Sequence, residues 1–134
     1  MTHTDPDILS GYRPPQSAGE LLSRYANGER HFRAAGLPGG STLNGAVLTG
    51  SDFNNSWLSV VDFRSADLPK VLFDETNVKI SDFRDADLHG TSFRDAALCR
   101  AMFAKAKLDN VRPEGASWYG ATVTDTRVLA ELFK

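Results

Sequence analysis

The sequence predicts an all-β solenoid, a coil of short strands stacked in layers, and three observations support this prediction. Residues 62–68 read DFRSADL and residues 82–88 read DFRDADL, so six of seven residues recur after 20 positions. From Leu43 onward, nearly every fifth residue is large and apolar. Two positions before each of these lies a small or β-branched residue. Self-similarity at a fixed period is the sequence signature of solenoid proteins.

The period of five residues excludes a helix as the repeating unit. Each helical residue advances by about 100°, so apolar residues five apart form no common face. In an extended chain, by contrast, residues two apart point to the same side. Each five-residue unit therefore turns one small and one large side chain inward and uses its other residues to turn a corner.

Phenylalanine indicates how many units complete one coil. The large positions alternate between Phe and Leu or Val, so Phe recurs every ten residues. Four units per coil place Phe on two opposite walls, and residues 41–128 then make just over four coils that rise about 4.8 Å each. The predicted core stack contains Phe53, Phe63, Phe73, Phe83, Phe93, Phe103, Leu48, Leu68, Leu88 and Leu108.

Two segments interrupt the period. LPGGSTL places Leu43 six positions after Leu37 instead of five, and VRPEG puts Pro113 at a large apolar position. Because proline cannot donate a hydrogen bond to a ladder, we expect a bulge or loop at both segments.

The repeated units resemble those of a known family. ADLPK, ADLHG, SDFRD and TSFRD are similar to the A(D/N)LXX repeats of pentapeptide-repeat proteins, over roughly residues 29–126. The resemblance implies a right-handed quadrilateral β-helix. In that family the position before the large residue favours Asp or Asn, whose side chains can bond nearby backbone and support the turn.

Both ends of an open coil need caps, because the terminal strand edges are otherwise unpaired. Ser17 and Glu20 have capping-box spacing, and Leu21, Leu22 and Tyr25 predict the apolar stripe of a short helix. The expected divisions are a flexible or loosely docked N-terminal arm (1–16), an N-terminal cap (17–40), the β-helix (41–126) and a C-terminal segment (127–134).

The C-terminal segment has helical apolar spacing at Val128, Leu129, Leu132 and Phe133. We expect a short helix that either covers the last coil or forms a dimer contact. The protein is therefore predicted to be a monomer or a homodimer through this segment.

Composition narrows the class of protein. At 134 residues the chain is one domain that can bury a core, and its net charge of -2 with a pI near 5.9 argues against direct nucleic-acid binding. Cys99 has no partner for an internal disulfide, and no run of 18 apolar residues is present. We expect a cytoplasmic protein that does not bind a membrane.

Residues suited to catalysis are sparse. His3, His31, His89 and Cys99 are scattered, and no two of them have the spacing of metal ligands or of a catalytic triad. The expectation is a protein that is not an enzyme, with no catalytic residue, no cofactor and no metal.

Carboxylates form a candidate acidic strip, but basic residues interrupt it. Arg64 and Arg84 follow Asp62 and Asp82 by two positions on the same wall, so these charges should pair. The strip consists of Asp62, Asp67, Asp82, Asp85 and Asp87.

Apolar residues at outward positions indicate a partner surface. The four-unit coil stacks Val60 over Ile80 at one corner, with Trp57 on the same wall and Met102 just round the corner. An exposed apolar cluster often marks a binding site, and Trp is enriched among binding hot spots. The other reading is that these residues pack half-buried against a loop or cap. All outward apolar residues are Val47, Trp57, Val60, Leu72, Ile80, Met102 and Tyr119.

Two functions fit a filled solenoid with flat walls. The favoured one is a scaffold that binds another protein through its outer walls. The alternative follows from the resemblance, because some pentapeptide-repeat proteins mimic duplex DNA, bind DNA gyrase or topoisomerase and protect it from quinolones or toxins. Mimicry requires a dominant negative field. Residues 41–125 hold 12 acidic and 9 basic side chains, a net charge of only -3.

Overall fold

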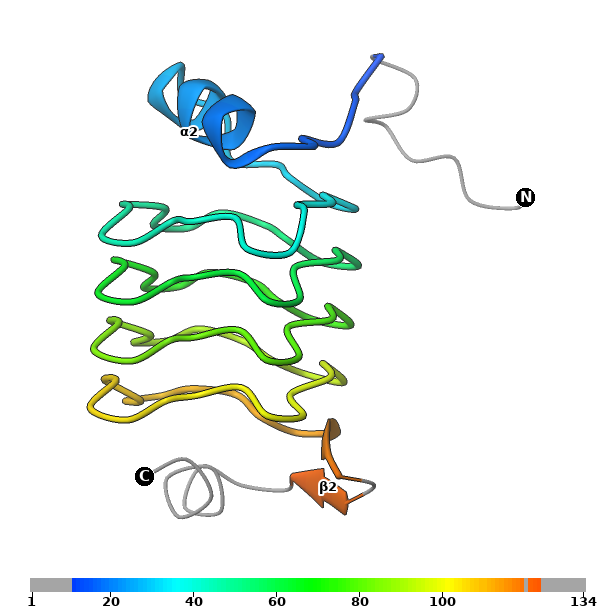
Figure 1. Ribbon diagram of the computed structural model, residues 1–134, viewed down its shortest axis with the longest axis vertical. Coiled ribbons are helices and arrows are strands. Elements are labelled where there is room, and N and C mark those ends of the chain that lie inside the picture. The colour runs from blue at the N-terminus through cyan, green and yellow to red at the C-terminus, as the bar shows by residue number, and fades with distance from the viewer. Residues whose placement is uncertain (1–10, 120, 124–134) are drawn as a thin grey trace.

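The computed structural model describes residues 11–119 and 121–123, which form a stack of coils with a helix at one end and a hairpin at the other (Figure 1). The order is α2 (Ala18–Ala26), the coils, β1 (Ala116–Trp118) and β2 (Ala121–Val123). Among these residues, no helix has the length and apolar character needed to cross a bilayer. The prediction of a β-helix is confirmed.

Parallel bridges join the coils at the predicted spacing of 20 residues, as from Asp62 to Asp82. Each wall contributes one bridged residue per coil, and the backbone hydrogen bonds on either side continue the contact, as from Phe83 N–H to the Met102 carbonyl at 2.7 Å. The bridges define four walls. The bridged residues of the first wall are Thr42, Asp62, Asp82 and Met102, and those of the second are Val47, Asp67, Asp87 and Lys107. The third wall has Asp52, Leu72, Ser92 and Arg112, and the fourth has Trp57, Asn77, Ala97 and Ser117.

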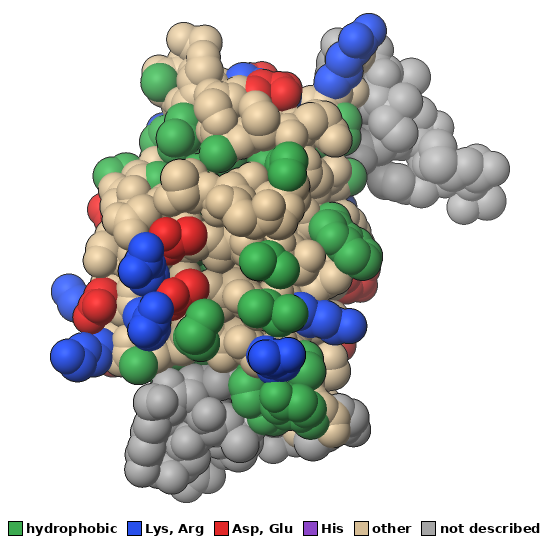
Figure 2. Space-filling model, viewed as in Figure 1, with side chains coloured by type: hydrophobic (Ala, Val, Ile, Leu, Met, Phe, Trp, Pro, Cys, Tyr) green, Lys and Arg blue, Asp and Glu red, His purple; other side chains and the backbone are tan. Residues whose placement is uncertain are grey.

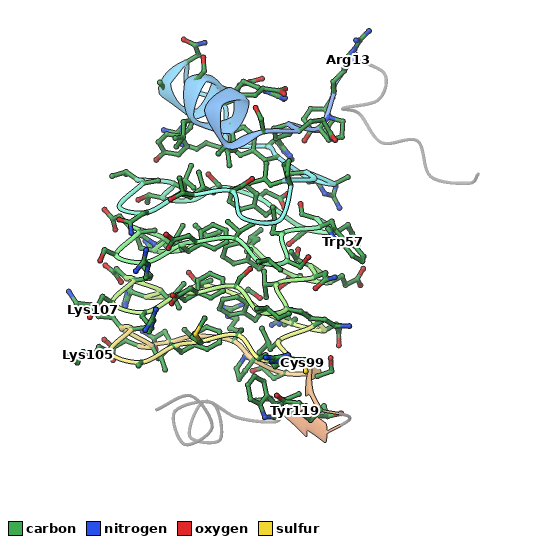
Figure 3. All side chains as sticks on the ribbon, in the orientation of Figure 1. Arg13, Trp57, Cys99, Lys105, Lys107 and Tyr119 are labelled. Carbon is green, nitrogen blue, oxygen red and sulfur yellow. The ribbon has the colours of Figure 1, made fainter. Side chains whose placement is uncertain are left out.

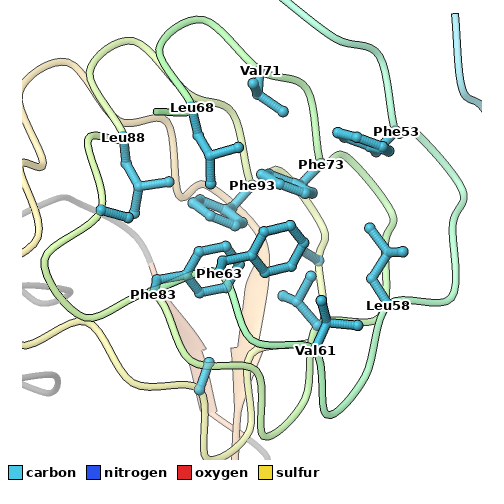
Figure 4. Close-up of a cluster of buried hydrophobic side chains, with 14 of the residues drawn as sticks. Phe53, Leu58, Val61, Phe63, Leu68, Val71, Phe73, Phe83, Leu88 and Phe93 are labelled. Carbon is cyan, nitrogen blue, oxygen red and sulfur yellow. The ribbon is translucent and has the colours of Figure 1, made fainter. Parts of the chain in front are cut away.

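Phenylalanine fills two opposite walls of the core, as predicted (Figure 4). Along one wall the rings of Phe63 and Phe83 stack with centroids 4.8 Å apart, which matches the coil spacing. Phe83 also meets Phe73 and Phe93 of the opposite wall edge to face, at 5.8 and 5.6 Å. Offset stacks and edge contacts are the favourable arrangements of aromatic rings.

One member of the predicted core stack differs from the rest. Leu108 is only partly buried, whereas the other nine are fully enclosed. The reason is its position, because the described bridges on its wall end with Lys107, so no further described unit stacks on Leu108.

Hydroxyl groups at the small inward positions link successive coils. Thr76 Oγ1 donates to the Phe53 carbonyl at 2.7 Å, and Ser81 Oγ donates to the Leu58 carbonyl at 2.6 Å, each across 23 residues. Ser51 Oγ is buried without a partner. Its position explains this, since α2 and its connection replace a regular coil on that side.

Most corners are turns closed by one hydrogen bond, such as Ala66 N–H to the Phe63 carbonyl at 3.0 Å. The third residue of the turn has a positive φ, as a type II turn requires. Gly45 and Gly90 occupy this position. Many non-glycine residues occupy it too, among them Asn55 and Asp85.

The two interruptions of the period have different outcomes. In LPGGSTL the extra residue forms the expected loop, closed by a Ser41 N–H bond to the Pro38 carbonyl at 3.1 Å, and it lengthens the bridge from His31 to Asp52 to 21 residues. The expectation of a bulge at Pro113 is wrong. Pro113 is buried and keeps the five-residue period. At the large apolar positions the backbone N–H bonds a carbonyl of the following coil, and the described ladder of this wall ends at Pro113, so the missing N–H of proline interrupts no described hydrogen bond.

The N-terminal helix is capped as predicted. Ser17 Oγ accepts the Glu20 N–H at 3.1 Å, and Glu20 Oε1 accepts the Gln16 N–H at 3.2 Å. Leu21 is fully buried against the first coil, but Leu22 is exposed, so Leu22 does not belong to the predicted stripe. The physical reason is that Leu21 and Tyr25, four residues apart, share the inner face.

The described part of the N-terminal arm, residues 11–16, is docked on the first coil, one of the two arrangements that we expected. Tyr12 Oη donates to the Arg33 carbonyl at 2.8 Å, and the Pro15 carbonyl accepts the Gly36 N–H at 3.1 Å. Pro15 is buried. These backbone contacts dock the segment on the first coil.

The C-terminal end of the described chain is a hairpin and not a further coil. Ser117 still bridges Ala97, but β1 then pairs antiparallel with β2, with Trp118 opposite Ala121. Tyr119, in the connecting turn, has a φ of 49°, and two-residue hairpin turns need such values. The predicted helix with Val128, Leu129, Leu132 and Phe133 lies outside the described residues.

Candidate functional site

The four residues of the candidate partner surface, Trp57, Val60, Ile80 and Met102, are termed the apolar ridge below. Trp57 is 63% exposed on its wall, and Val60 and Ile80 are 44% and 42% exposed at the next corner. Met102 lies on the adjoining wall. All seven outward apolar residues of the sequence prediction are exposed. Val60 and Ile80 are thus a little more than half-buried, and Val60 lies close to Gly39 of the loop in the preceding coil.

The ridge lies around one corner of the coils and reaches both adjoining walls. Figure 2 shows apolar side chains on the face in view, with Lys and Arg side chains beside them. Figure 3, in the same orientation, places Trp57 and Tyr119 on one side of the stack, and Lys105 and Lys107 on the other. Tyr119 is 66% exposed and was not included in the predicted surface, although the sequence pattern had marked it as outward and apolar.

Val60 and Ile80 are stacked members of the same corner. The Val60 N–H bonds the Lys79 carbonyl at 2.9 Å, and both side chains line a shallow depression of about 230 Å³. Gly39 and Gly40 contact Val60 from the preceding coil, where the Gly40 N–H bonds the Val60 carbonyl at 2.7 Å. The corner thus holds two apolar side chains in a fixed row.

The backbone at these two residues is strained. Val60 has a φ of 57° and Ile80 a φ of 62°. The left-handed region costs an L-residue about 1–2 kcal/mol, and a β-branched residue there is an outlier. At the equivalent position of other described corners the chain has Gly, Asn or Asp, but also Ser65, Lys70, Glu75, Arg100 and Lys105, so β-branching is what distinguishes Val60 and Ile80. Folding alone does not explain the choice of Val and Ile.

Beside the ridge lies a ladder of alternating charges. Arg64 and Arg84 each bind the carboxylate two residues earlier in the chain. Arg64 Nε and Nη2 donate to Asp62 at 3.0 Å, and Arg84 Nη2 donates to Asp82 at 2.7 Å. Arg64 Nε also lies 3.8 Å from Asp82 Oδ2. The predicted pairing is confirmed, and this wall is close to neutral.

The pairing changes the acidity of both carboxyl groups. The hydrogen bond from Arg64 lowers the pKa of Asp62 from 3.8 to about 2. Partial burial would raise the pKa of Asp82, but hydrogen bonds from Arg84 outweigh it and the pKa falls. Both groups stay ionised under ordinary conditions.

The other three carboxylates of the candidate acidic strip, Asp67, Asp85 and Asp87, lie outside the wall of Asp62 and Asp82. Asp67 and Asp87 bridge each other on the adjoining wall, and Asp87 Oδ1 accepts the His89 N–H at 3.0 Å. Asp85 occupies the corner between these two walls. The five carboxylates are thus neighbours around one corner, but the two nearest the ridge are neutralised by arginine.

Of the residues suited to catalysis, His31, His89 and Cys99 are described, and the structure does not bring these three together; His3 lies outside the described residues. His31 Nδ1 lies 3.7 Å from Asp52 Oδ2, while His89 and Cys99 belong to different corners. Within residues 11–119 and 121–123, no group of three or more His, Cys, Asp or Glu side chains is placed to hold a metal ion.

Two larger depressions lie away from the ridge. One, of about 550 Å³, lies beside α2 and is lined by Tyr12, Arg13, Arg24 and Arg30 among others. Arg24 there is already bound to Glu29 at 2.7 Å and to Glu20 at 3.0 Å. The other, of about 670 Å³, includes Lys70, His89 and Arg112. Both are open, and basic side chains line each of them.

Comparison with solved structures places this architecture among known folds. The chain aligns with QnrB1, a plasmid-mediated fluoroquinolone resistance protein, with a TM-score of 0.57 and 20% identity, over 69% of this chain and 57% of that one. It aligns with HetL of Nostoc sp. strain PCC 7120, a pentapeptide repeat protein involved in heterocyst differentiation regulation, with a TM-score of 0.52 and 24% identity, over 75% of this chain and 46% of that one. The chain thus spans about half the length of these two proteins, and the likeness concerns the fold.

A sequence comparison agrees with the structural one. None of the curated proteins matches the chain. The family model for pentapeptide repeats, however, matches residues 41–78 and 81–112 in eight copies, which is more than half of the chain. The repeats, the bridges 20 residues apart and the stacked Phe walls agree, and the chain belongs to the pentapeptide-repeat family, with its right-handed β-helix.

Proposed function

We propose that this protein is a non-enzymatic, cytoplasmic scaffold that binds another protein through the apolar ridge. The observation that carries the proposal is the conformation of Val60 and Ile80, two exposed β-branched residues stacked at a corner where their backbone is strained. Strained backbone conformations tend to occur at functional sites, and exposed apolar clusters at partner sites.

Trp57 supports the same surface. Its side chain is 63% exposed three residues before Val60, and large aromatic side chains contribute strongly at interfaces. The ridge also stands on a rigid base, because Phe63 and Phe83 stack directly behind the adjoining wall. A preorganised surface loses little conformational entropy when a partner binds.

The DNA-mimic hypothesis, with DNA gyrase or topoisomerase as the partner, has weaker support. Its carboxylates Asp62 and Asp82 are both bound by arginine, so they do not present the field of a phosphate backbone. The similarity to QnrB1, at 20% sequence identity, concerns the fold alone.

Affinity capture from an extract of the native cell tests the scaffold proposal. Wild type, Ile80→Asp and Val47→Asp are immobilised in equal amounts. Val47 is the matched control, because it is 52% exposed but lies on a different wall. We expect at least one protein to be retained by wild type and Val47→Asp and lost on Ile80→Asp. Retention of the same proteins by all three would contradict the proposal.

Inhibition of gyrase supercoiling, titrated to micromolar protein at two salt concentrations, tests the alternative. A DNA mimic should inhibit, and more weakly at high salt, because its field is screened. Inhibition lost in Asp62→Asn/Asp82→Asn but kept in Ile80→Asp would replace the scaffold proposal with the mimic.

A further inference from the structure

We infer that the partner segment bound by the apolar ridge is an amphipathic helix whose apolar stripe is flanked by carboxylates. This inference rests on the proposed function and specifies the chemistry of the partner. It follows from the unpaired charges along the ridge and from the spacing of its rows.

Two cations without carboxylate partners lie along the ridge. Lys79 directly precedes Ile80, and Arg100 occupies the next position of the same corner, below Ile80. Both are exposed. Within the described part of the chain, neither forms an ion pair.

The other charges near the ridge compensate one another. Asp62, Arg64 and Asp82 line the depression between Val60 and Ile80, but each is held in the ladder of ion pairs, with Asp82 bound by Arg84. The uncompensated charge of the ridge is therefore positive. Charge complementarity selects partners and orients them, so the partner should present carboxylates to Lys79 and Arg100.

The spacing of the rows fits a helix that lies along the stack. Successive coils are about 4.8 Å apart, so Gly40, Val60, Ile80 and Arg100 form rows at that interval. A helix presents side chains of one face about every 5.4 Å. The mismatch is small over the few rows of the ridge, so side chains one helical turn apart can contact successive rows.

The composition of the ridge completes the fit. The depression of about 230 Å³ between Val60 and Ile80 receives an apolar side chain, and Trp57 and Met102 flank it on the two adjoining walls. Apolar anchors surrounded by oppositely charged residues form the binding mode in which a helix fills a groove.

Two synthetic helical peptides of about 18 residues, roughly five turns, test the inference. Both carry the same Leu stripe; one has Glu and the other Lys on both flanks. Fluorescence anisotropy of the labelled peptides measures binding to wild type, Ile80→Asp, Val47→Asp and the double variant Lys79→Glu/Arg100→Glu. Circular dichroism shows that each variant is folded.

We expect wild type and Val47→Asp to bind the Glu peptide saturably and roughly five- to tenfold more tightly than the Lys peptide, as two exposed ion pairs allow. The double variant should reverse this preference, and Ile80→Asp should bind neither peptide. No saturable binding of the Glu peptide, no preference for it, or an unchanged preference in the double variant would each overturn the inference.

The affinity capture from cell extract distinguishes a failure of the acidic-helix inference from a failure of the proposed scaffold function. If the native partner is lost on Ile80→Asp but kept by Lys79→Glu/Arg100→Glu, the scaffold stands and the acidic helix is wrong. If capture does not depend on Ile80, the proposed function itself fails.

Discussion

The interior walls and the apolar ridge both use stacked apolar residues, but under opposite conditions. Phe63 and Phe83 lie in extended backbone, are fully buried and stack 4.8 Å apart. Val60 and Ile80 repeat with the same 20-residue spacing, but their side chains face solvent and their φ values are positive. The interior residues stabilise the coil that positions them, whereas the ridge residues are held in place by a coil that gains little from them.

This difference separates folding from function within one repeat. A residue that lowers the free energy of the folded state needs no other explanation. Val60 and Ile80 add strain and exposed apolar area, so their presence points to a role outside folding. Four substitutions test the contrast, in order of decreasing effect.

The largest effect is expected in the interior, for Phe83→Ala. Phe83 is fully buried and contacts four other rings, so its removal leaves a cavity and should lower the free energy of unfolding by about 3–5 kcal/mol. Urea denaturation measures the loss. Phe83→Leu, which refills part of the space, should cost clearly less; equal and small losses would show that the interior is not packed as described.

On the ridge, Ile80→Asn should have the opposite sign. Asn tolerates the left-handed region, and Asn55 and Asn110 already occupy it at equivalent corners. We expect a gain of about 1 kcal/mol in the free energy of unfolding, together with loss of partner binding. Val47→Asn, at an exposed bridge position in another wall, serves as the control and should not stabilise. A destabilised Ile80→Asn would mean that Ile80 serves folding after all.

A smaller, pH-dependent loss of stability is expected for Arg64→Gln. The pKa of Asp62 is lowered from 3.8 to about 2 in the folded chain, so the ion pair stabilises fully above 3.8 and is lost as the pH falls toward 2. Wild type should therefore exceed the variant in stability at pH 6, and the difference should narrow below pH 3.8 and vanish as the pH falls below about 2. Arg100→Gln, which breaks no described ion pair, should show no such dependence on pH; denaturation midpoints along a pH series check both.

The smallest effect on stability is expected for Lys79→Ala. Lys79 is exposed and forms no described ion pair, so the change should stay within about 0.5 kcal/mol. The same variant should nevertheless weaken binding of the Glu-flanked peptide. A clear loss of stability, measured by the same denaturation, would assign Lys79 to the fold and not to the surface.

Much of the fold could be predicted because the same pattern of inward and outward residues recurs in every five-residue unit. Phe recurring every ten residues specifies two opposite walls, and the echo of DFRSADL at Asp82 specifies the coil length. The outward position of Val60 and Ile80 followed from the same arithmetic. The pairing of Arg64 with Asp62 could also be predicted, since residues two apart in an extended chain share a face.

The irregular parts could not be predicted in this way, because one copy of a segment has no repeat to confirm it. Residues 11–16 contain proline and look like a loose arm, yet the Pro15 carbonyl is bound by Gly36. Pro113 looks like a break, yet it is tolerated because its missing N–H lies at the end of the described ladder. The β1–β2 hairpin likewise replaces a coil that the five-residue period had continued.

The sequence by itself determined which residues face inward, how many complete a coil and which apolar residues remain outside. Only the tertiary structure decided the backbone conformation of those outer residues. Val and Ile by themselves avoid a positive φ, but the hydrogen bonds of the Val60 and Ile80 N–H groups to Lys79 and Cys99 of the next coil close the corner in that conformation. The strain that marks the ridge arises from this closure, because stacking many bonded coils outweighs the local preference of single residues.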